Sequence, residues 1–475
     1  MTPQGPESAA KLHAVPTEPV PDTAALVKGL RAAFNSERTR PIEWRLGQLD
    51  ALKRMCEERE AEIAEATAQD LGKPAIETFI TEIAVTIAEI DYVRRRLRGW
   101  MKPERVPTAL PAQPGRSYIQ REPLGVVLIM GAWNYPFQLT LGPFIAAVAA
   151  GNCAVLKPSE IAPHTSALIA RLVPQYLDRD CVKVFEGGIG PTTQLLTEQF
   201  DHIFYTGSGN VGRIIMEAAA KHLTPVTLEL GGKSPTIIDR DADLDVAARR
   251  IVWGKFTNAG QTCVAPDYIL AHESIKPALI SKLKSCIQSF FGDNPRKSSD
   301  YGRIVNERHH RRLTKLLGSG RIVHGGEGSE SERYLAPTLL DDVSPDSPIM
   351  AEEIFGPILP ILSIRSIDEA ISFVNARPKP LALYVFTSSG ESADRVLERT
   401  TSGGAVVNHV IMHLAVPGLP FGGVGPSGMG AYHGRHGFEV FSHRKSVLKK
   451  PTVLDPPIAY PPYTEGKKRW IRRLM

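Results

Sequence analysis

From Leu124 onward the chain alternates short, mostly apolar runs with longer stretches of helical pattern. The apolar runs cover residues 126–130, 154–156, 182–185, 203–205 and 226–228, and the helical stretches between them include residues 166–177 and 211–223. Strands that are apolar throughout are typical of parallel sheets covered by helices on both faces. The sequence therefore predicts an α/β fold built on a doubly wound parallel sheet.

A second series of the same kind begins after Leu230, so we expect two α/β lobes. A strand at residues 236–238 leads into a helix near residues 243–257, which Asp243 or Asp245 could cap, and residues 403–407 look like another buried strand. Two lobes that join near residues 229–233 predict a ligand site in the cleft between them. The expected division is a flexible arm (1–21), a cofactor domain (22–105 and 125–229), a catalytic domain (230–440), and bridging or oligomerisation segments (106–124 and 441–475).

Composition excludes several classes of protein. The 475 residues are 43% hydrophobic and 23% charged, with a net charge of +5, and no face combines basic residues with aromatic ones, so a dedicated nucleic-acid binder is not expected. The five cysteines are far apart and lack any Cys-x-x-Cys, so neither disulfides nor zinc are indicated. Without a signal-peptide pattern, this usage favours a reducing, cytoplasmic location.

The first hundred residues have a helical pattern. Apolar residues recur there every three or four positions, at Ile76, Ile80, Ile83, Ile87, Ile90 and Leu97. This spacing predicts one apolar helical face that packs on a sheet, with Glu82 and Glu89 outside that face.

The uncharged segment 123–156 is long enough to suggest a membrane span. Gly131, Pro136, Gly142, Pro143 and Gly151 are among the residues that interrupt it, so we expect strands, turns and a small-residue helix at residues 144–150 instead. Metal sites are not expected either. The alternating aspartates at residues 239–245 lack the glycine and glutamate of a calcium loop, and His433, His436 and His443 have no carboxylate at ligand spacing.

Two residues suggest covalent chemistry. Glu229 lies in the phrase Leu-Glu-Leu-Gly-Gly-Lys, and Cys263 follows thirty-four residues later in Asn-Ala-Gly-Gln-Thr-Cys. A soft nucleophile with a carboxylate base can form a thioester and then hydrolyse it. Gly207, Ser208 and Gly212 belong to a Gly-x-Gly-x-x-Gly turn between a predicted strand and helix, which favours dinucleotide binding. That turn also offers Glu229 a competing role, as the acid that holds a ribose.

These phrases resemble the signatures of the aldehyde dehydrogenases, over residues 26–448. The resemblance implies that Glu229 is the general base and that Lys157 and Glu160 hold the adenosine ribose of NAD, with NADP also possible. It further implies that Asn134, in Ala-Trp-Asn-Tyr-Pro, completes an oxyanion hole. In Glu-Glu-Ile-Phe-Gly-Pro, the resemblance assigns Glu353 to the nicotinamide ribose and Phe355 to the ring.

Within that family the chain is most similar to the class 3 group of fatty and aromatic aldehyde dehydrogenases. The evidence is Trp-Asn-Tyr-Pro at residues 133–136 and the glycine-rich phrase at residues 419–434, although His409 stands where that group usually has aspartate. The resemblance implies a homodimer bridged by C-terminal residues, and a medium- or long-chain aliphatic or an aromatic aldehyde as the substrate.

The expected reaction is oxidation of an aldehyde to a carboxylic acid. Cys263 attacks the aldehyde, the Asn134 amide and the Cys263 backbone N–H hold the oxyanion, hydride leaves to the cofactor, and Glu229 activates the water that releases the acid. Three alternatives stay open: a coenzyme A-acylating dehydrogenase, a cofactor-independent cysteine hydrolase, and a catalytically silent binding protein. Retention of Glu229 disfavours the first alternative.

The C-terminal ten residues alternate basic and apolar side chains. On a helix, Trp470, Ile471 and Leu474 would share a face, which is the pattern of a weak peripheral anchor to anionic lipid. A tail that is solvated or docked on protein is the favoured interpretation, and no membrane-spanning segment is expected.

Overall fold

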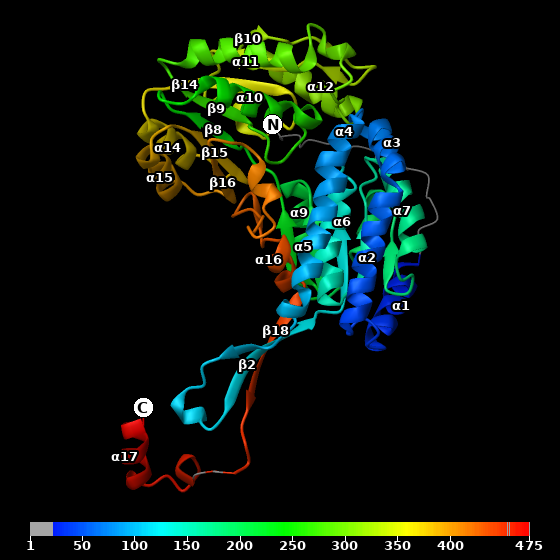
Figure 1. Cartoon of the computed structure of the whole chain (residues 1–475), viewed down its shortest axis with the longest axis vertical. Coiled ribbons are helices and arrows are strands. Elements are labelled where there is room, and N and C mark those ends of the chain that lie inside the picture. Colours follow the sequence, from blue (N-terminus) through cyan, green and yellow to red (C-terminus); the bar gives the residue numbers. More distant parts are fainter. Residues whose placement is uncertain (1–21, 454, 456, 475) are drawn as a thin grey trace, which may run out of the picture.

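The computed structural model describes residues 22–453, 455 and 457–474, and the expected N-terminal arm (1–21) lies outside them. Two lobes, each built around a large sheet, stand one above the other in Figure 1, and an extended arm projects below them. The predicted α/β architecture with doubly wound sheets is confirmed.

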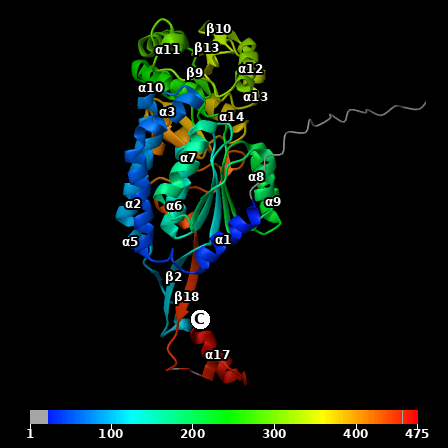
Figure 2. The same cartoon turned by 90° about the vertical axis from the view of Figure 1, so that its right-hand side faces the viewer.

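The first lobe contains a six-stranded sheet that is parallel except for one edge strand. Its strands, in spatial order, are β17 (Gly428–Met429), β7 (Val226–Glu229), β6 (His202–Thr206), β3 (Val126–Met130), β4 (Cys153–Lys157) and β5 (Val182–Val184). Its helices are α6 (Gln138–Ala150), α7 (Pro163–Tyr176), α8 (Ile189–Leu195) and α9 (Gly209–Ala220). Figure 2 shows the strands with α6 and α7 on one side and α8 and α9 on the other.

Strand order in this sheet reverses at one place. From β3 the chain proceeds outward through β4 to β5, then returns to β6 on the opposite side of β3 and continues to β7. In open α/β sheets, ligands bind beyond the carboxyl ends of the strands where the order reverses. The turns that follow β3 and β6 are therefore the expected place for a cofactor.

The second lobe contains a seven-stranded sheet that is also parallel except for one edge strand. Its strands, in spatial order, are β10 (Arg321–His324), β13 (Thr338–Asp341), β14 (Ile358–Ile364), β9 (Tyr268–His272), β8 (Pro235–Ile238), β15 (Ala382–Phe386) and β16 (Gly404–Val407). Its helices are α10 (Leu244–Phe256), α11 (Lys276–Phe291), α12 (Glu307–Leu316), α13 (Pro348–Ala351), α14 (Ile367–Asn375) and α15 (Gly390–Arg399). The prediction of a buried strand at residues 403–407 was wrong, because β16 is an edge strand with partly and fully exposed residues.

A layer of N-terminal helices covers the first lobe, and it corrects one prediction. The layer comprises α1 (Thr23–Asn35), α2 (Ile42–Glu58), α3 (Glu60–Leu71), α4 (Ala75–Thr78), the π-helix η1 (Phe79–Ile83) and α5 (Ala84–Trp100). The expected apolar face holds from Ile83 to Leu97, but Ile76 and Ile80 are exposed and Glu82 is buried. The π-helical turn rotates the preceding residues, and α5 packs on α2 and α6 instead of on a sheet.

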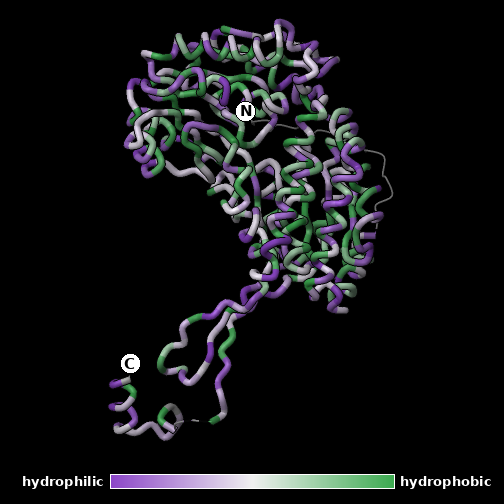
Figure 3. Tube along the Cα trace, in the orientation of Figure 1, coloured by the Kyte–Doolittle hydropathy of each residue, from purple (hydrophilic) through white to green (hydrophobic). Residues whose placement is uncertain are grey.

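The arm is a three-stranded antiparallel sheet. It consists of β1 (Glu104–Val106), β2 (Arg116–Pro123) and β18 (Ser442–Lys449), and β18 pairs with β2 over eight residues. The C-terminal helix α17 (Glu465–Leu474) lies at the far end of the arm, away from both lobes (Figure 1). Hydrophobic colour is concentrated inside the lobes in Figure 3, in agreement with cores centred on the two large sheets.

Helix α6 accounts for the uncharged segment. Every residue from Leu139 to Ala150 is buried, which is expected of a helix that is apolar on all sides. With 13 residues it is shorter than the about 20 that a membrane span needs. Within the described part of the chain, no helix is long and apolar enough to cross a membrane.

Candidate functional site

The segment from Glu229 to Ser234 connects the two large sheets. Glu229 ends β7 at the carboxyl edge of the first sheet, and Pro235 begins β8 at the amino edge of the second. Cys263 precedes β9 and Glu353 precedes β14, so both also lie at the amino edge of the second sheet. The structure thus places the cysteine and both acids where the two sheet edges meet.

Glu229 is a buried acid without partners. Its side chain is 2% exposed, and neither carboxylate oxygen accepts a hydrogen bond from any described residue. Burial raises the pKa of Glu229 well above its usual value. The backbone is well fixed, because the Glu229 carbonyl accepts from Gly207 N–H and β7 pairs with β6 and β17. In its ionised form such a group is a stronger base than a solvated carboxylate, and it can accept a proton from a water or thiol that reaches it.

Cys263 lies just beyond the 3₁₀-helical turn Thr257–Gly260 that follows α10. Asn258, Ala259 and Gly260 all have left-handed backbone conformations, with φ of 53°, 49° and 75°. Burial raises the pKa of the partly exposed Cys263 thiol above its usual value, as do the nearby charges of Glu353 and Glu229. The resting side chain is therefore a thiol, and its attack on a carbonyl requires a base.

Asn134 reaches the cysteine loop from the turn after β3. Its side-chain amide donates to the Gln261 carbonyl at 3.0 Å, and the neighbouring Tyr135 hydroxyl lies 2.5 Å from the Thr262 hydroxyl. Asn134 is almost completely buried, and the hydrogen bond to Gln261 holds its amide in a fixed orientation. That is the arrangement a preorganised oxyanion donor requires.

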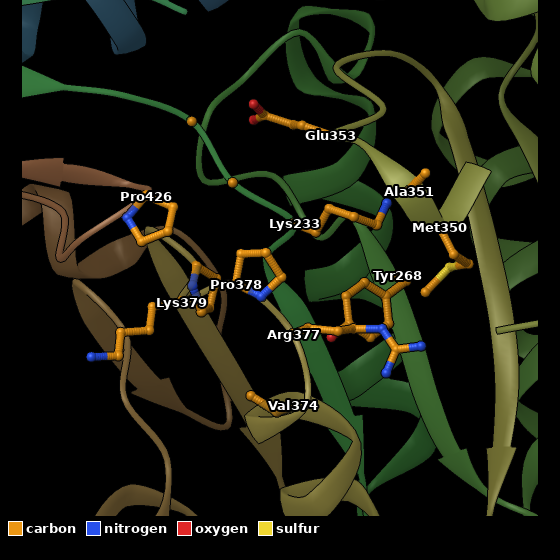
Figure 4. Close-up of a pocket in the computed structure, with 13 residues that line it drawn as sticks. Lys233, Tyr268, Met350, Ala351, Glu353, Val374, Arg377, Pro378, Lys379 and Pro426 are labelled. Atoms are coloured by element: carbon orange, nitrogen blue, oxygen red, sulfur yellow. The ribbon is translucent and has the colours of Figure 1, made fainter. Parts of the chain in front are cut away.

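Glu353 folds back against the turn that follows Glu229. A side chain at Gly231 would overlap the Glu353 carboxylate, so glycine is required there for this approach. Burial and the charge of Asp267 raise the pKa of Glu353 to about 8, against the opposing effects of the Gly232 N–H, Lys233 and Lys255. A pocket of about 150 Å³ opens beside it, and Figure 4 shows Glu353 at one end of the pocket and Val374 at the other.

Lys255 is a site residue that the sequence reasoning missed. Its ammonium group is completely buried, eight residues before Cys263, and donates to no described residue. Burial lowers the pKa of Lys255 to about 8. Lys255 lies between two other buried residues of α10, Gly254 and Phe256. Lysine is seldom fully buried, so a lone lysine in this run was the signal that the sequence offered.

Five of the seven predicted cofactor residues gather at the carboxyl edge of the first sheet. Lys157 ends β4, and its ammonium pairs with Glu160 at 2.5 Å. Gly207 lies between β6 and α9 with φ of 158°, Ser208 caps α9, and a side chain at Gly212 would crowd Leu230. A glycine-rich turn at a helix N-terminus fits a pyrophosphate.

Phe355 links Glu353 to the turn after β3. Its ring lies edge-on to the Trp133 ring, with centroids 5.2 Å apart, and Trp133 also contacts His309. The backbone of Phe355 is left-handed, with φ of 49°, which turns the chain sharply after the acid. The ten predicted site residues thus fall into two adjacent groups, one around Cys263 and the other at the ends of β4 and β6.

Residues considered as metal ligands have other partners. Asp243 caps α10 by accepting from Val246 N–H at 3.0 Å, as predicted, and Asp241 accepts from Thr387. Among the described residues, no group of three or more His, Cys, Asp or Glu side chains is placed to hold a metal ion.

Comparisons with known proteins agree with this geometry. The model of the aldehyde dehydrogenase family matches residues 4–447. Among similar proteins, the mouse "Aldehyde dehydrogenase, dimeric NADP-preferring" is 53% identical over 90% of this chain and 94% of its own. The mouse "Aldehyde dehydrogenase family 3 member A2" is 53% identical over 93% and 92%. A Staphylococcus aureus AldH structure in a substrate-bound state is 49% identical, with a TM-score of 0.92, over 95% of this chain and 98% of its own.

The predicted resemblance to class 3 enzymes, the NAD(P) cofactor and the aldehyde substrate are therefore confirmed at the level of the family. The chain belongs to the aldehyde dehydrogenase family and is an NAD(P)-dependent oxidoreductase that acts on aldehydes.

Proposed function

We propose that the protein oxidises aldehydes to carboxylic acids through a thioester on Cys263, with Glu229 as the base for hydrolysis. The observation that carries this proposal is the buried, unpartnered carboxylate of Glu229 at the meeting edges of the two sheets, where Cys263 also lies. A carboxylate in an ion pair usually stabilises the fold, whereas the carboxylate of Glu229 is available to bind a proton.

In the first half of the reaction, Glu229 takes the thiol proton and the sulfur bonds to the aldehyde carbon. The Asn134 amide and the Cys263 N–H hold the resulting oxyanion. When bound, the nicotinamide ring supplies the acceptor for the hydride. Loss of that hydride leaves an acyl group on the Cys263 sulfur.

Before the second half, Glu229 releases the thiol proton to solvent. The ionised Glu229 then takes a proton from water, and the resulting hydroxide attacks the acyl carbon. The carbon–sulfur bond breaks, Glu229 returns its proton to the leaving sulfur, and the carboxylic acid leaves the site. Dry surroundings matter for both halves, because a desolvated carboxylate is a stronger base than one in water.

We propose that the first lobe holds the cofactor, with Lys157 and Glu160 at the adenosine ribose and with Gly207, Ser208 and Gly212 at the pyrophosphate. Glu353 and Phe355 belong to the nicotinamide end, beside Gly231 and Trp133. With the boundaries predicted from the sequence, these roles assign residues 22–105 and 125–229 to cofactor binding and residues 230–440 to catalysis, except that β17 completes the sheet of the first lobe.

Replacement of Cys263 tests the proposal. Cys263→Ala should abolish aldehyde-dependent reduction of NAD, because no other group can form the thioester, and NAD should still bind, as measured by fluorescence titration. The matched control is Cys286→Ala, which removes another partly exposed thiol outside the site and should leave activity unchanged. Near-normal turnover in Cys263→Ala would rule out the covalent mechanism.

For the cofactor, we propose that NAD is used well, although a relative is named NADP-preferring. Glu160 is exposed at the sheet edge, where a carboxylate accepts from a ribose 2′-hydroxyl and repels a 2′-phosphate. Glu160→Gln should therefore raise the ratio of kcat/KM for NADP to that for NAD. An unchanged ratio would place Glu160 away from the ribose.

For the substrate, we propose an aliphatic aldehyde of medium or long chain, or an aromatic one. An open hollow of about 220 Å³ lies against α10, the helix that precedes the cysteine loop, and it is lined by Trp253, Met412, His409, Arg249 and Arg250. Rings and thioethers favour apolar chains over short polar ones. Assays with aldehydes of increasing length should show kcat/KM rising with length, and a preference for short aldehydes would exclude this proposal.

For assembly, we propose a cytoplasmic homodimer in which the arm and α17 contact a second copy. A relative is named dimeric, and the arm extends away from both lobes. Trp470 is 60% exposed on α17, so the helix has an apolar group available for a partner. Sedimentation velocity tests the dimer and cell fractionation the location. Sedimentation with anionic vesicles, with and without residues 464–475, tests the weaker membrane alternative.

A further inference from the structure

Residues 73–82, in the first helical layer, direct ionisable side chains toward the site. Glu82 is completely buried, Lys73 is 2% exposed, and Glu77 is partly buried. In a regular α-helix, Glu77 and Glu82 would point about 140° apart, because each residue turns the helix by about 100°. The wider π-helical turn at Phe79–Ile83 brings positions five apart closer to one face, and such turns are frequent at functional sites.

Lys73 and Glu82 hold the asparagine loop. The Lys73 ammonium lies 2.6 Å from one Glu82 oxygen, donates to the Asn134 carbonyl at 3.2 Å, and lies 4.2 Å from the centre of the Tyr135 ring. The second Glu82 oxygen accepts from Phe137 N–H at 2.8 Å, at the N-terminus of α6. The pair therefore fixes the backbone on both sides of Tyr135.

Glu77 holds the cysteine loop. Its carboxylate accepts from Asn258 N–H at 2.8 Å, at the first of the three left-handed residues that lead to Cys263. Left-handed conformations are uncommon for residues other than glycine, so they persist only where surrounding contacts hold them. The Asn258 side chain in turn donates to the Asn134 carbonyl at 2.7 Å, which joins the two loops.

We infer that residues 73–82 form a positioning element for the reaction, in which Glu77 fixes the cysteine loop and the Lys73–Glu82 pair fixes the asparagine loop. The inference rests on the proposed function, because it assumes that Cys263 and Asn134 act on the same carbonyl. The three residues hold backbone atoms rather than substrate. A displacement of about 1 Å between nucleophile and oxyanion donor can lower a rate on the order of a hundredfold.

Glu77 provides the cleanest test, because replacing it does not break the buried ion pair between Lys73 and Glu82. Glu77→Leu removes the acceptor for Asn258 N–H, whereas Glu77→Gln keeps an acceptor oxygen without the charge. We expect kcat to fall about tenfold or more in Glu77→Leu and to stay within about twofold in Glu77→Gln, with the Kd for NAD unchanged in both. Glu60→Leu, which replaces an exposed glutamate on α3, is the matched control and should match the wild type.

The rate at which iodoacetamide alkylates Cys263, followed by mass spectrometry, reports directly on how the cysteine loop positions the thiol. The rate should change at least about threefold in Glu77→Leu and little in Glu77→Gln if the acceptor positions the thiol. Unchanged kcat and alkylation in Glu77→Leu, or equal losses in both variants, would overturn the inference. A loss of activity that only follows a lower Tm would also overturn it. If the wild type reduces no NAD(P) with any aldehyde, the proposed function fails instead, and alkylation still tests the positioning.

Discussion

Two carboxylates in this protein are almost completely removed from water, and their surroundings are opposite. Glu82 pairs with Lys73 and accepts from Phe137 N–H, whereas Glu229 accepts from no described residue. A buried carboxylate is costly unless it is paired, so the contacts of Glu82 let it support the fold, whereas burial raises the pKa of Glu229 and favours its protonated form. The comparison indicates that, of these two buried carboxylates, the one without hydrogen-bond partners is the one proposed to act as a base.

The same contrast holds for two buried lysines. Lys73 has a carboxylate, a carbonyl and an aromatic ring as partners, whereas Lys255 donates to no described residue and its pKa is lowered to about 8. Lys73 belongs to the layer that supports the site, and Lys255 lies in the second lobe, eight residues before Cys263. The buried lysine that has partners therefore lies in the helical layer that supports the site, and the buried lysine without described partners lies in the second lobe.

The largest change in stability is expected from breaking the buried ion pair between Lys73 and Glu82. Lys73→Met should lower the free energy of unfolding by about 3–5 kcal/mol, because it leaves the Glu82 carboxylate buried without its cation. Chemical denaturation at neutral pH measures the change. Lys53→Met is the matched control: Lys53 pairs with Asp91 at 2.9 Å near the surface, so its loss should cost at most about 1 kcal/mol. Equal effects of the two substitutions would remove the distinction between buried and surface pairs.

A smaller effect, an increase in stability, is expected when the unpartnered carboxylate of Glu229 is replaced. The folded pKa of Glu229 is raised, so the folded protein binds its proton more tightly than the unfolded chain does, and this stabilisation is lost as pH rises through the folded pKa. Glu229→Gln should remove that loss and give a higher Tm than the wild type at alkaline pH.

Thermal unfolding of both proteins across a series of pH values checks this expectation. The Tm difference should grow in favour of Glu229→Gln as pH increases, in the usual trade between stability and activity. A difference that does not depend on pH would mean that Glu229 does not titrate in the folded protein.

Much of the fold could be predicted because its signals are local. Uncharged apolar runs predicted β3, β4 and β6, and an aspartate before a helical stretch predicted the cap of α10. Motifs that carry their own backbone geometry, such as the turn at Gly207, were placed for the same reason. Their order along the chain sufficed to assign the family.

The rest depended on contacts that spacing does not reveal. The regular recurrence of isoleucines predicted that Glu82 faces solvent, but one π-helical turn reverses this, and no residue in the sequence marks that turn. Strand β16 was predicted as buried because its residues are apolar, although no described strand covers its outer edge. The approach of Glu353 to Gly231 joins residues more than a hundred positions apart.

The most direct test of the account is a rapid-mixing experiment on Glu229→Gln with NAD and an aldehyde. If Glu229 is the base for hydrolysis and Asn134 and Cys263 act as proposed, absorbance should show a burst of about one reduced cofactor per site, followed by turnover slowed on the order of a hundredfold or more. The acyl group should then be detectable on Cys263 by mass spectrometry. A linear time course without a burst, together with a raised KM for NAD, would contradict the account and assign Glu229 to the ribose instead.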